Sequence, residues 1–181
     1  MSRLQDPLPV KPVAALFSAH RDLLTQAARK LEEKVGLMDY ISPEFIFDQS
    51  EYYREEMGWP LIKRFFAGRE LMDPGELVPL KVFTASLEEE FLDSGSKRQV
   101  NIDPGYISTE RLVLATGKNN VQRIYLGRGV WGDLTLIFER GAFKALPWTY
   151  ADYASEEVRS VMADIRKKYQ DQLRARAREE E

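Results

Sequence analysis

Four short apolar segments in the second half of the chain constrain its fold more than any other feature. They are residues 98–102, 110–116, 122–126 and 132–139. Short apolar segments bounded by Gly, Pro, Asn and Asp are typical of strands joined by tight turns. We therefore expect antiparallel hairpins here, with turns at 103–106, 117–120, 127–131 and 140–143.

The first half of the chain contains three further predicted strands. Residues 11–18 are apolar and bounded by polar residues, as in a buried strand. Residues 38–48 form a second strand, in which Pro43 predicts an edge position or a bulge. Residues 61–71 form a third strand, although their Ala, Gly and Arg content fits a helix nearly as well.

Two helices are predicted between these strands. The first follows Ser18, which is placed to cap it, and ends at Gly36; its apolar stripe is Leu24, Ala28, Leu31 and Val35. The second begins at Asp73-Pro74, with proline in its first turn. Pro79 then predicts either a late start near Leu80 or a kink, because proline lacks the N–H that a helix interior needs.

The clearest predicted helix spans residues 155–173. Ser155 caps it, and its apolar stripe is Val158, Met162, Ile165, Tyr169 and Leu173. The element order predicts an α+β fold with a mostly antiparallel sheet, a ferredoxin-like βαββαβ core, added β-hairpins and a long C-terminal helix. A length of 181 residues suits a single domain, with an N-terminal extension at 1–9 and a solvated tail at 175–181.

Composition excludes several classes of protein. No run of 18 apolar residues is present and the first residues do not resemble a secretory signal, so neither a membrane span nor secretion is expected. The chain has no cysteine, which excludes a thiol nucleophile and leads us to expect a cytoplasmic protein. With 26 basic and 29 acidic residues and a net charge of −3, general nucleic-acid binding is not expected. A homo-oligomer stays open.

Three motif-like features carry no chemistry of their own. Residues 127–132 spell G-x-G-x-x-G, but a predicted strand follows where a dinucleotide fold needs a helix, so a glycine-rich hairpin is the better interpretation. Gly117-Lys118 lacks the remainder of a P-loop. His20 is the only histidine and has no G-x-S-x-G partner sequence, which argues against a catalytic triad.

Basic residues gather near the ends of the predicted strands. Asp103-Pro104-Gly105 has the sequence of a type II turn, and Arg98, Lys118 and Arg123 lie close to it in the predicted sheet. Arg and Lys that converge at strand ends suit a phosphate or carboxylate. Scattered surface salt bridges would give the same sequence pattern.

An acidic group precedes the third strand. Its members are Asp48, Glu51, Glu55 and Glu56. Carboxylates are the ligands that Mg²⁺ and Ca²⁺ prefer, so this group is a candidate metal site. A solvated helical turn would have the same composition, and both interpretations stay open.

Several stretches resemble an uncharacterised prokaryotic family, domain of unknown function 4416. They are VKPVAALFS, YYREEMG with the following L-x-x-RF, VNIDPGY, LVLAT-x-K, RIYLG-x-G and LPWTY-x-DY. No activity is established for this family, and the GTP-binding label of some members has no conventional motif behind it here. The resemblance implies recurring polar positions at Tyr52, Tyr53, Glu56, Arg64, Arg98, Asp103, Tyr106, Lys118, Arg123 and Asp152.

These observations lead to one functional expectation and one alternative. We expect a protein that binds a small anionic, nucleotide- or phosphate-like ligand without a P-loop, and whether it turns the ligand over stays open. Its expected ligand-binding residues are Arg64, Arg98, Asp103, Tyr106, Lys118 and Arg123. No cofactor is identifiable, but Glu56 and Asp103 are candidate Mg²⁺ ligands. The alternative is a non-enzymatic interaction module whose partner surface is a sheet edge or the aromatic residues Trp59, Trp131 and Trp148.

Overall fold

The computed structural model describes residues 3–47 and 53–179. In chain order its elements are β1 (Lys11–Ser18), α1 (Arg21–Val35), β2 (Met38–Ile41), β3 (Phe45–Phe47), α2 (Arg54–Met57), β4 (Leu61–Gly68), η2 (Pro74–Glu76), α3 (Leu77–Glu89), β5 (Asn101–Ile107), β6 (Arg111–Thr116), β7 (Arg123–Gly127), β8 (Val130–Glu139), β9 (Ala142–Ala145), α4 (Ala151–Ala154) and α5 (Glu156–Glu179).

The strands of the described residues form one nine-stranded antiparallel sheet. Its main order is β2-β4-β1-β5-β6-β8-β7, while β3 also pairs with β4 and β9 with β8. The predicted α+β class, the mostly antiparallel sheet and the long C-terminal helix are therefore confirmed. Strand β4 lies between β1 and β2, which α1 connects. The classification of this core as ferredoxin-like stays a prediction.

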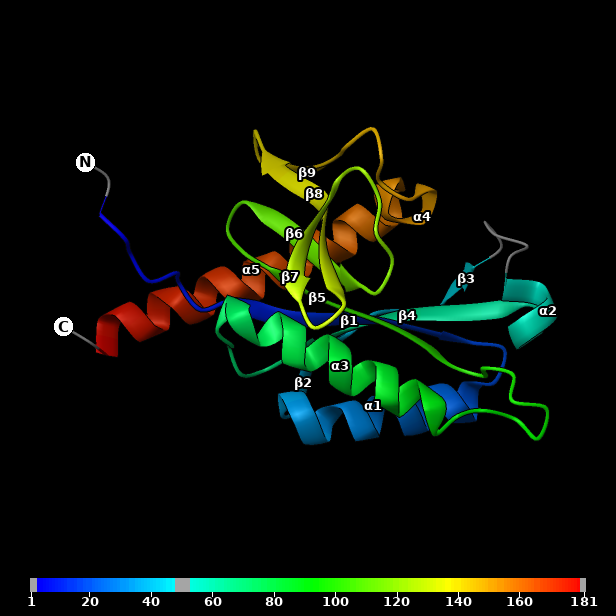
Figure 1. The fold of residues 1–181 in the computed structure, drawn as a ribbon. Coiled ribbons are helices and arrows are strands. Elements are labelled where there is room, and N and C mark those ends of the chain that lie inside the picture. The colour runs from blue at the N-terminus through cyan, green and yellow to red at the C-terminus, as the bar shows by residue number, and fades with distance from the viewer. Residues whose placement is uncertain (1–2, 48–52, 180–181) are drawn as a thin grey trace.

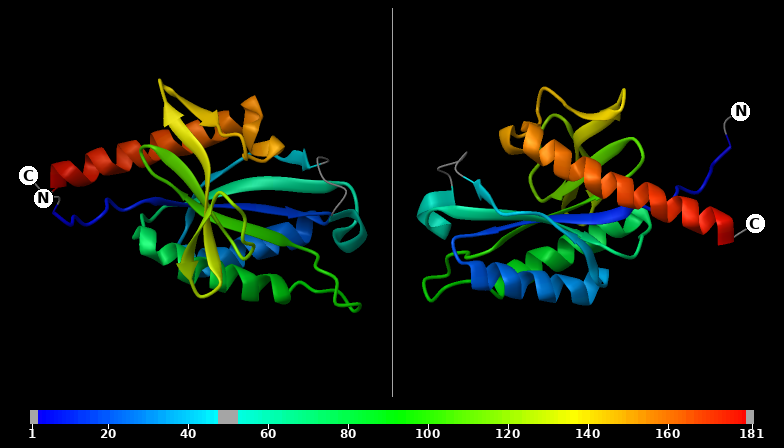
Figure 2. Two further views of the ribbon diagram at one scale, coloured as in Figure 1. Left: turned by 45° about the horizontal axis from the view of Figure 1, so that its top comes forward. Right: turned by 180° about the vertical axis from the view of Figure 1, so that it is seen from behind.

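Helices cover both faces of the central strands. Figures 1 and 2 show α1 and α3 side by side beneath the sheet, and α5 running diagonally across the other face. Successive strand residues point to opposite faces. In β1, Ala14 and Leu16 accordingly pack with α1 and α3, whereas Val13 and Ala15 pack with α5.

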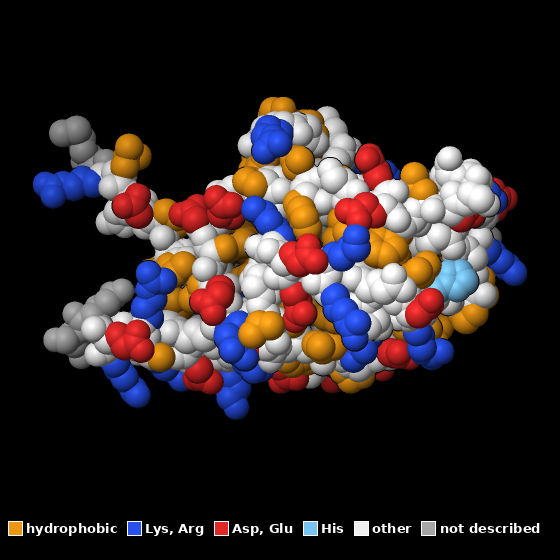
Figure 3. All heavy atoms as spheres, turned by 90° about the horizontal axis from the view of Figure 1, so that it is seen from below, with side chains coloured by type: hydrophobic (Ala, Val, Ile, Leu, Met, Phe, Trp, Pro, Cys, Tyr) orange, Lys and Arg blue, Asp and Glu red, His pale blue; other side chains and the backbone are white. Residues whose placement is uncertain are grey.

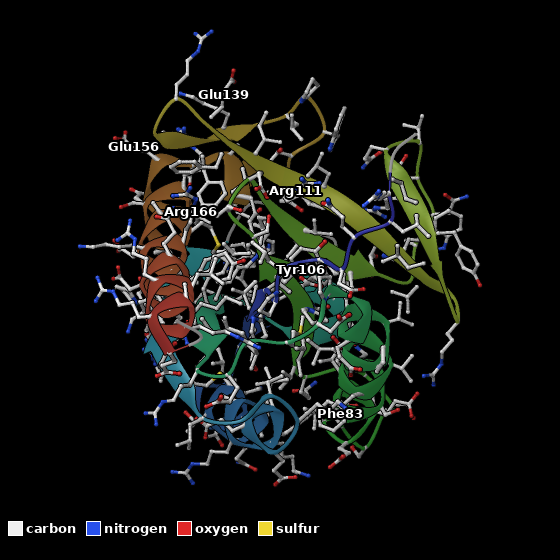
Figure 4. The ribbon with its side chains drawn as sticks, turned by 90° about the vertical axis from the view of Figure 1, so that its left-hand side faces the viewer. Phe83, Tyr106, Arg111, Glu139, Glu156 and Arg166 are labelled. Carbon is white, nitrogen blue, oxygen red and sulfur yellow. The ribbon has the colours of Figure 1, made fainter. Side chains whose placement is uncertain are left out.

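The long helix α5 is anchored along its length. Its predicted stripe is confirmed, with Leu173 at the margin of the core that the other four members share with the sheet. The guanidinium of Arg166, labelled in Figure 4, lies 3.4 Å from the centre of the Phe138 ring, and its Nε donates to the Thr109 carbonyl at 2.8 Å. Ser155 caps α5 as predicted, because its hydroxyl accepts the Val158 N–H at 3.2 Å. Within the described residues, no helix is long and apolar enough to cross a membrane.

The predicted turn at Asp103-Pro104-Gly105 is wrong, because these residues lie inside β5. Strand β5 pairs with β1 along its whole length, and Asp103 stands opposite Ala15. Gly105 serves a different need from a turn. A Cβ built there would lie 2.4 Å from the Val113 carbonyl oxygen and 2.7 Å from Leu114 Cδ2, so glycine permits β6 to approach β5 closely.

Two helix predictions also need correction. Ser18 does not cap α1, which begins at Arg21 with His20 as its N-cap. The Ser18 hydroxyl instead accepts the His20 N–H and donates to the Gln99 carbonyl. Pro79 causes neither a late start nor a kink, because it lies in the first turn of α3. The backbone N–H groups of a first turn have no partner within the helix, so a proline there removes no hydrogen bond.

The remaining differences concern strand and helix ends. Residues 38–48 form two short strands, β2 and β3, and Pro43 lies between them, while 48–52 fall outside the described residues. Strand β9 was not predicted, and α5 extends beyond its predicted end to Glu179 with exposed side chains. The glycine-rich hairpin is confirmed. The turn between β7 and β8 holds Arg128 and Gly129 at φ of 53° and 76°, as a type I′ turn requires.

The close approach at Gly105 generates a test of the fold. Gly105→Ala is expected to lower the free energy of unfolding by about 1–3 kcal/mol, because the added methyl group overpacks the contact between β5 and β6. Urea denaturation measures this change. Gly117→Ala is the matched control, since a Cβ there meets nothing within 4 Å. The control should stay within about 0.5 kcal/mol of the parent protein. Equal stability of the two variants would contradict the close approach.

Candidate functional site

A pocket of about 700 Å³ opens on the face of the sheet that α5 covers. Strands β1, β4 and β5 supply Phe17, Lys63 and Asp103 to its walls. The segment that follows β6 and the short helix α4 supply further wall residues, including Lys118 and Asp152. The pocket therefore joins residues that lie far apart in the sequence.

Charged side chains are concentrated in this pocket. Five cations face three carboxylates among the lining residues, a formal excess of two positive charges. The cations are Lys63, Lys81, Arg98, Lys118 and Arg123, and the carboxylates are Asp103, Asp133 and Asp152. Such a surplus inside a concave site favours an anionic ligand.

Arg98 is held by acceptors on three elements. Its guanidinium donates to Asn101 Oδ1 at 2.7 Å and to Glu56 Oε2 at 3.0 Å, and it lies 3.8 Å from Glu88 Oε2. Burial lowers the pKa of Arg98, but the hydrogen bond to Glu56 and the charges of Glu88 and Glu56 outweigh that effect and raise the pKa. The Arg98 guanidinium also lies 5.7 Å from the centre of the Tyr53 ring. Arg98 is therefore a fixed cation at the pocket wall.

Arg123 is held with similar rigidity. Its Nε donates to Asp133 Oδ2 at 2.7 Å, and this pair is buried. The other guanidinium nitrogens donate to the Lys118 carbonyl and the Tyr150 hydroxyl, both at 2.8 Å. These contacts tie β7 and β8 to the segments that flank the pocket.

Lys63 is the most unusual residue of the site. Its side chain is only 4% exposed, and its ammonium donates to Asp152 Oδ2 at 2.5 Å. Four aromatic rings surround the ammonium, with centres 4.6–5.5 Å away; they belong to Phe17, Phe47, Phe65 and Tyr153. Ring faces and a carboxylate both stabilise a cation, so they offset part of the cost of burying the charge.

Tyr153 lies beside this lysine. Burial, and to a smaller extent the charges of Asp103, Asp152 and Asp133, raises the pKa of Tyr153 well above its usual value. The phenol therefore stays protonated at neutral pH. It is a hydrogen-bond donor in the pocket wall.

Three buried donor atoms of the pocket have no acceptor among the described residues. They are Arg98 Nε, Asn101 Nδ2 and the Tyr153 hydroxyl. Buried polar atoms in native proteins are nearly always hydrogen-bonded, so unsatisfied donors gathered in one pocket need a functional account. An acceptor-rich ligand would supply one.

The family follows from a comparison with known family models. The model described as domain of unknown function (DUF4416) matches residues 8–169. The chain belongs to this family. The matched region includes every residue of the pocket. No curated protein and no solved structure matches the chain.

In this member of the DUF4416 family, the pocket brings together four of the six predicted ligand residues. They are Arg98, Asp103, Lys118 and Arg123. Arg64 points away because it follows Lys63 in β4 and so faces α1 and α3; its guanidinium donates twice to the Ser42 carbonyl. Tyr106, labelled in Figure 4, lies inside the molecule and packs with residues of α3 and β6.

The predicted metal ligands lie differently from expectation. Glu56 does not line the pocket and is paired with Arg98, and Asp103 is a pocket residue. Asp48 and Glu51 lie outside the described residues. Across 3–47 and 53–179, no group of three His, Cys, Asp or Glu side chains could hold a metal ion.

Sequence reasoning missed Lys63, Lys81 and Tyr153. Lys63 shares one strand face with Leu61, Phe65 and Ala67, all buried. A lysine that interrupts an apolar strand face was the available signal, because residues 61–71 were predicted as a strand.

The Lys63–Asp152 pair generates a stability test. Asp152→Ala is expected to cost about 3–5 kcal/mol of unfolding free energy, because it leaves a buried ammonium without its carboxylate. The double variant Lys63→Met/Asp152→Leu should recover much of this loss, since it removes both charges. The coupling is measured by urea denaturation of the parent protein, Lys63→Met, Asp152→Leu and the double variant, which form one double-mutant cycle.

An exposed pair provides the control for that cycle. Arg21 and Glu44 are joined at 3.0 Å but stand in solvent. Glu44→Ala should change stability little, because water screens such pairs. If Asp152→Ala lowers the free energy of unfolding no more than Glu44→Ala does, the buried Lys63 ammonium is not stabilised by Asp152.

Proposed function

We propose that the pocket binds a small anionic, nucleotide- or phosphate-like ligand without a P-loop. One observation carries the proposal: the pocket gathers five cationic side chains and three buried donor atoms that have no acceptor among the described residues. Phosphate and carboxylate oxygens are strong acceptors for both kinds of group.

The size and walls of the pocket support this class of ligand. A volume of about 700 Å³ lies within the ~300–1,000 Å³ typical of small-molecule sites. Phe17, Phe47 and Tyr53 form an aromatic cluster at the wall, with Phe17 centred 5.1 Å from Phe47 and 5.0 Å from Tyr53. A ligand that combines a planar ring with acidic groups would use both the rings and the cations.

Magnesium would enter this site with the ligand. Mg²⁺ is usually held by one or two carboxylates together with substrate phosphates. The Asp103 side chain lines the pocket and forms no hydrogen bond or ion pair with another described side chain, so its carboxylate is the one that would face such an ion. Glu56 is engaged by Arg98 and is a poorer candidate.

The alternative, a protein-interaction module, has less support. The three tryptophans have separate local partners: Arg54 lies 5.8 Å from the Trp59 ring centre, Trp131 packs against Tyr125, and Trp148 donates to the Leu134 carbonyl. None of these contacts joins two of the tryptophans, although Trp131 and the Trp148 acceptor Leu134 both belong to β8.

Three finer expectations accompany the proposal. Figure 3 shows acidic and basic side chains interspersed over the face that carries α1 and α3, which supports an absence of general nucleic-acid binding there. The strand order β2-β4-β1-β5 supports a ferredoxin-like classification. The cytoplasmic location and the homo-oligomer stay predictions.

The proposal is tested by thermal denaturation with nucleotides, sugar phosphates and dicarboxylates, with and without Mg²⁺. A ligand at 100 times its Kd stabilises the folded state by about 2.7 kcal/mol, or roughly 5–10 °C for a chain of this size. Arg98→Gln is expected to weaken binding about 10- to 100-fold, the loss of a charge-assisted hydrogen bond. Glu56→Gln should strengthen binding, because it releases Arg98 from a competing carboxylate.

Arg64→Gln is the matched control. Arg64 follows Lys63 in β4 and its side chain lies on the opposite face of the strand, where it donates to the Ser42 carbonyl. The substitution therefore changes the stability of the protein without ligand, but the increase in melting temperature that a ligand causes should stay the same. A panel without any shift would overturn the proposal for these ligand classes. So would a shift that Arg64→Gln abolishes and Arg98→Gln preserves.

A further inference from the structure

Binding an anion does not account for the way in which Lys63 is built into the pocket. Arg98, Lys118 and Arg123 already provide cations there. A buried ion pair is often no more stabilising than apolar side chains of similar volume. A lysine in an apolar wall, next to a carboxylate and at a ligand pocket, is therefore a candidate for chemistry.

We propose that Lys63 forms a Schiff base with an aldehyde or ketone that carries a phosphate or carboxylate group. The inference rests on the proposed function, because the other cations of the pocket would hold the anionic group while its carbonyl carbon faces Lys63. It adds a covalent step that the binding proposal does not contain.

Two neighbours supply the proton transfers that this step needs. Asp152 Oδ2 accepts the hydrogen bond of Lys63 Nζ at 2.5 Å, so it is the base that would take a proton from the ammonium in this step. A nucleophile within hydrogen-bond reach of its base is the arrangement that amine catalysis requires. The Tyr153 hydroxyl has no acceptor among the described residues, and it is placed to donate to the carbonyl oxygen of the ligand.

The step balances without any further reactant. The amine of Lys63 attacks the carbonyl carbon, a C–N bond forms, and the C=O π electrons move to oxygen, which takes a proton from Tyr153. Tyr153 recovers its proton from the positively charged nitrogen, which regains its lone pair. Asp152 then returns its proton to the hydroxyl group, the C–O bond breaks, and water leaves as that lone pair forms C=N. The ammonium and the carbonyl compound thus become a protonated imine and one water molecule, with no change in charge or oxidation state.

The aromatic cage suits the product as well as the free lysine. A protonated imine is a cation at the position of the ammonium, and the same four rings and the same carboxylate surround it. The cage therefore favours the protonated imine over the neutral one. A protonated imine is the electron-withdrawing form that activates the adjacent carbon.

Borohydride trapping tests the proposal in the full-length protein. The probe is glyceraldehyde 3-phosphate at limiting concentration, and reduction converts an imine to a stable secondary amine. Peptide mapping by mass spectrometry is expected to find the label at Lys63 before other lysines. This mapping needs no variant. Lys11 is the internal control, since it is also buried and paired with a carboxylate, Asp39 at 3.0 Å, but does not line the pocket.

Three variants separate chemistry from binding and folding. Lys63→Arg keeps a cation and should keep phosphate binding while it abolishes trapping at this position. Asp152→Asn should slow trapping about a hundredfold, the usual contribution of a general base, with folding checked by circular dichroism. Lys30→Met removes a surface lysine that pairs with Glu90 and does not line the pocket, and it should leave trapping at Lys63 unchanged.

The outcomes distinguish this inference from the proposed function. Label spread over exposed lysines with Lys63 unmodified would overturn the Schiff base, and inorganic phosphate or nucleotide binding that depends on Arg98 would leave the proposed function standing. Trapping that persists undiminished in Asp152→Asn would overturn the role of Asp152. Specific trapping at Lys63 that inorganic phosphate does not compete would support the covalent step and contradict the anion site.

Discussion

The structure depends on the burial of both faces of its central strands. Strands β1 and β4 are almost fully buried, so every residue along them must suit the layer it faces. Helices α1 and α3 take one face, and α5 takes the other. Because successive side chains alternate between the two faces, a shift of one residue in the register of β4 would turn Lys63 toward α1 and α3 and Arg64 toward the pocket.

Two buried lysines lie at opposite ends of the contact between α5 and the sheet. Near the end of α5, the Lys11 ammonium donates to Asp39, to the Gly68 carbonyl and to Gln172 of the helix. Near its start, Lys63 holds Asp152 of α4. Burial lowers the pKa of Lys11, although Asp39 acts in the opposite direction. Between these ends α5 packs apolar side chains against the sheet, and the pocket is lined by residues of α4 but by none of α5.

The pocket combines properties that rarely occur together without a ligand. Its cations are fixed by short hydrogen bonds, its donors are incompletely satisfied, and one wall is aromatic. Fixed cations bind an anion at a lower entropic cost than flexible ones, because their side chains are already ordered. The same walls exclude water around Lys63, whose side chain is only 4% exposed.

The sequence alone determined the α+β class, the β7–β8 hairpin, the apolar stripes of α1 and α5, and three cations of the pocket. These features depend on local composition and periodicity, which act over a few residues. The expected hairpin around residues 117–120 is wrong, because β6 pairs with β8 and not with β7. Asp103 was found for the wrong reason, since its Pro-Gly neighbours suggested a turn but lie in β5. Only the tertiary structure decided that Gly105 admits β6, that Lys63 rather than Arg64 enters the pocket, and that Asp152 and Tyr153 reach it. Those outcomes depend on strand register and on contacts between residues up to 89 positions apart, which no local pattern encodes.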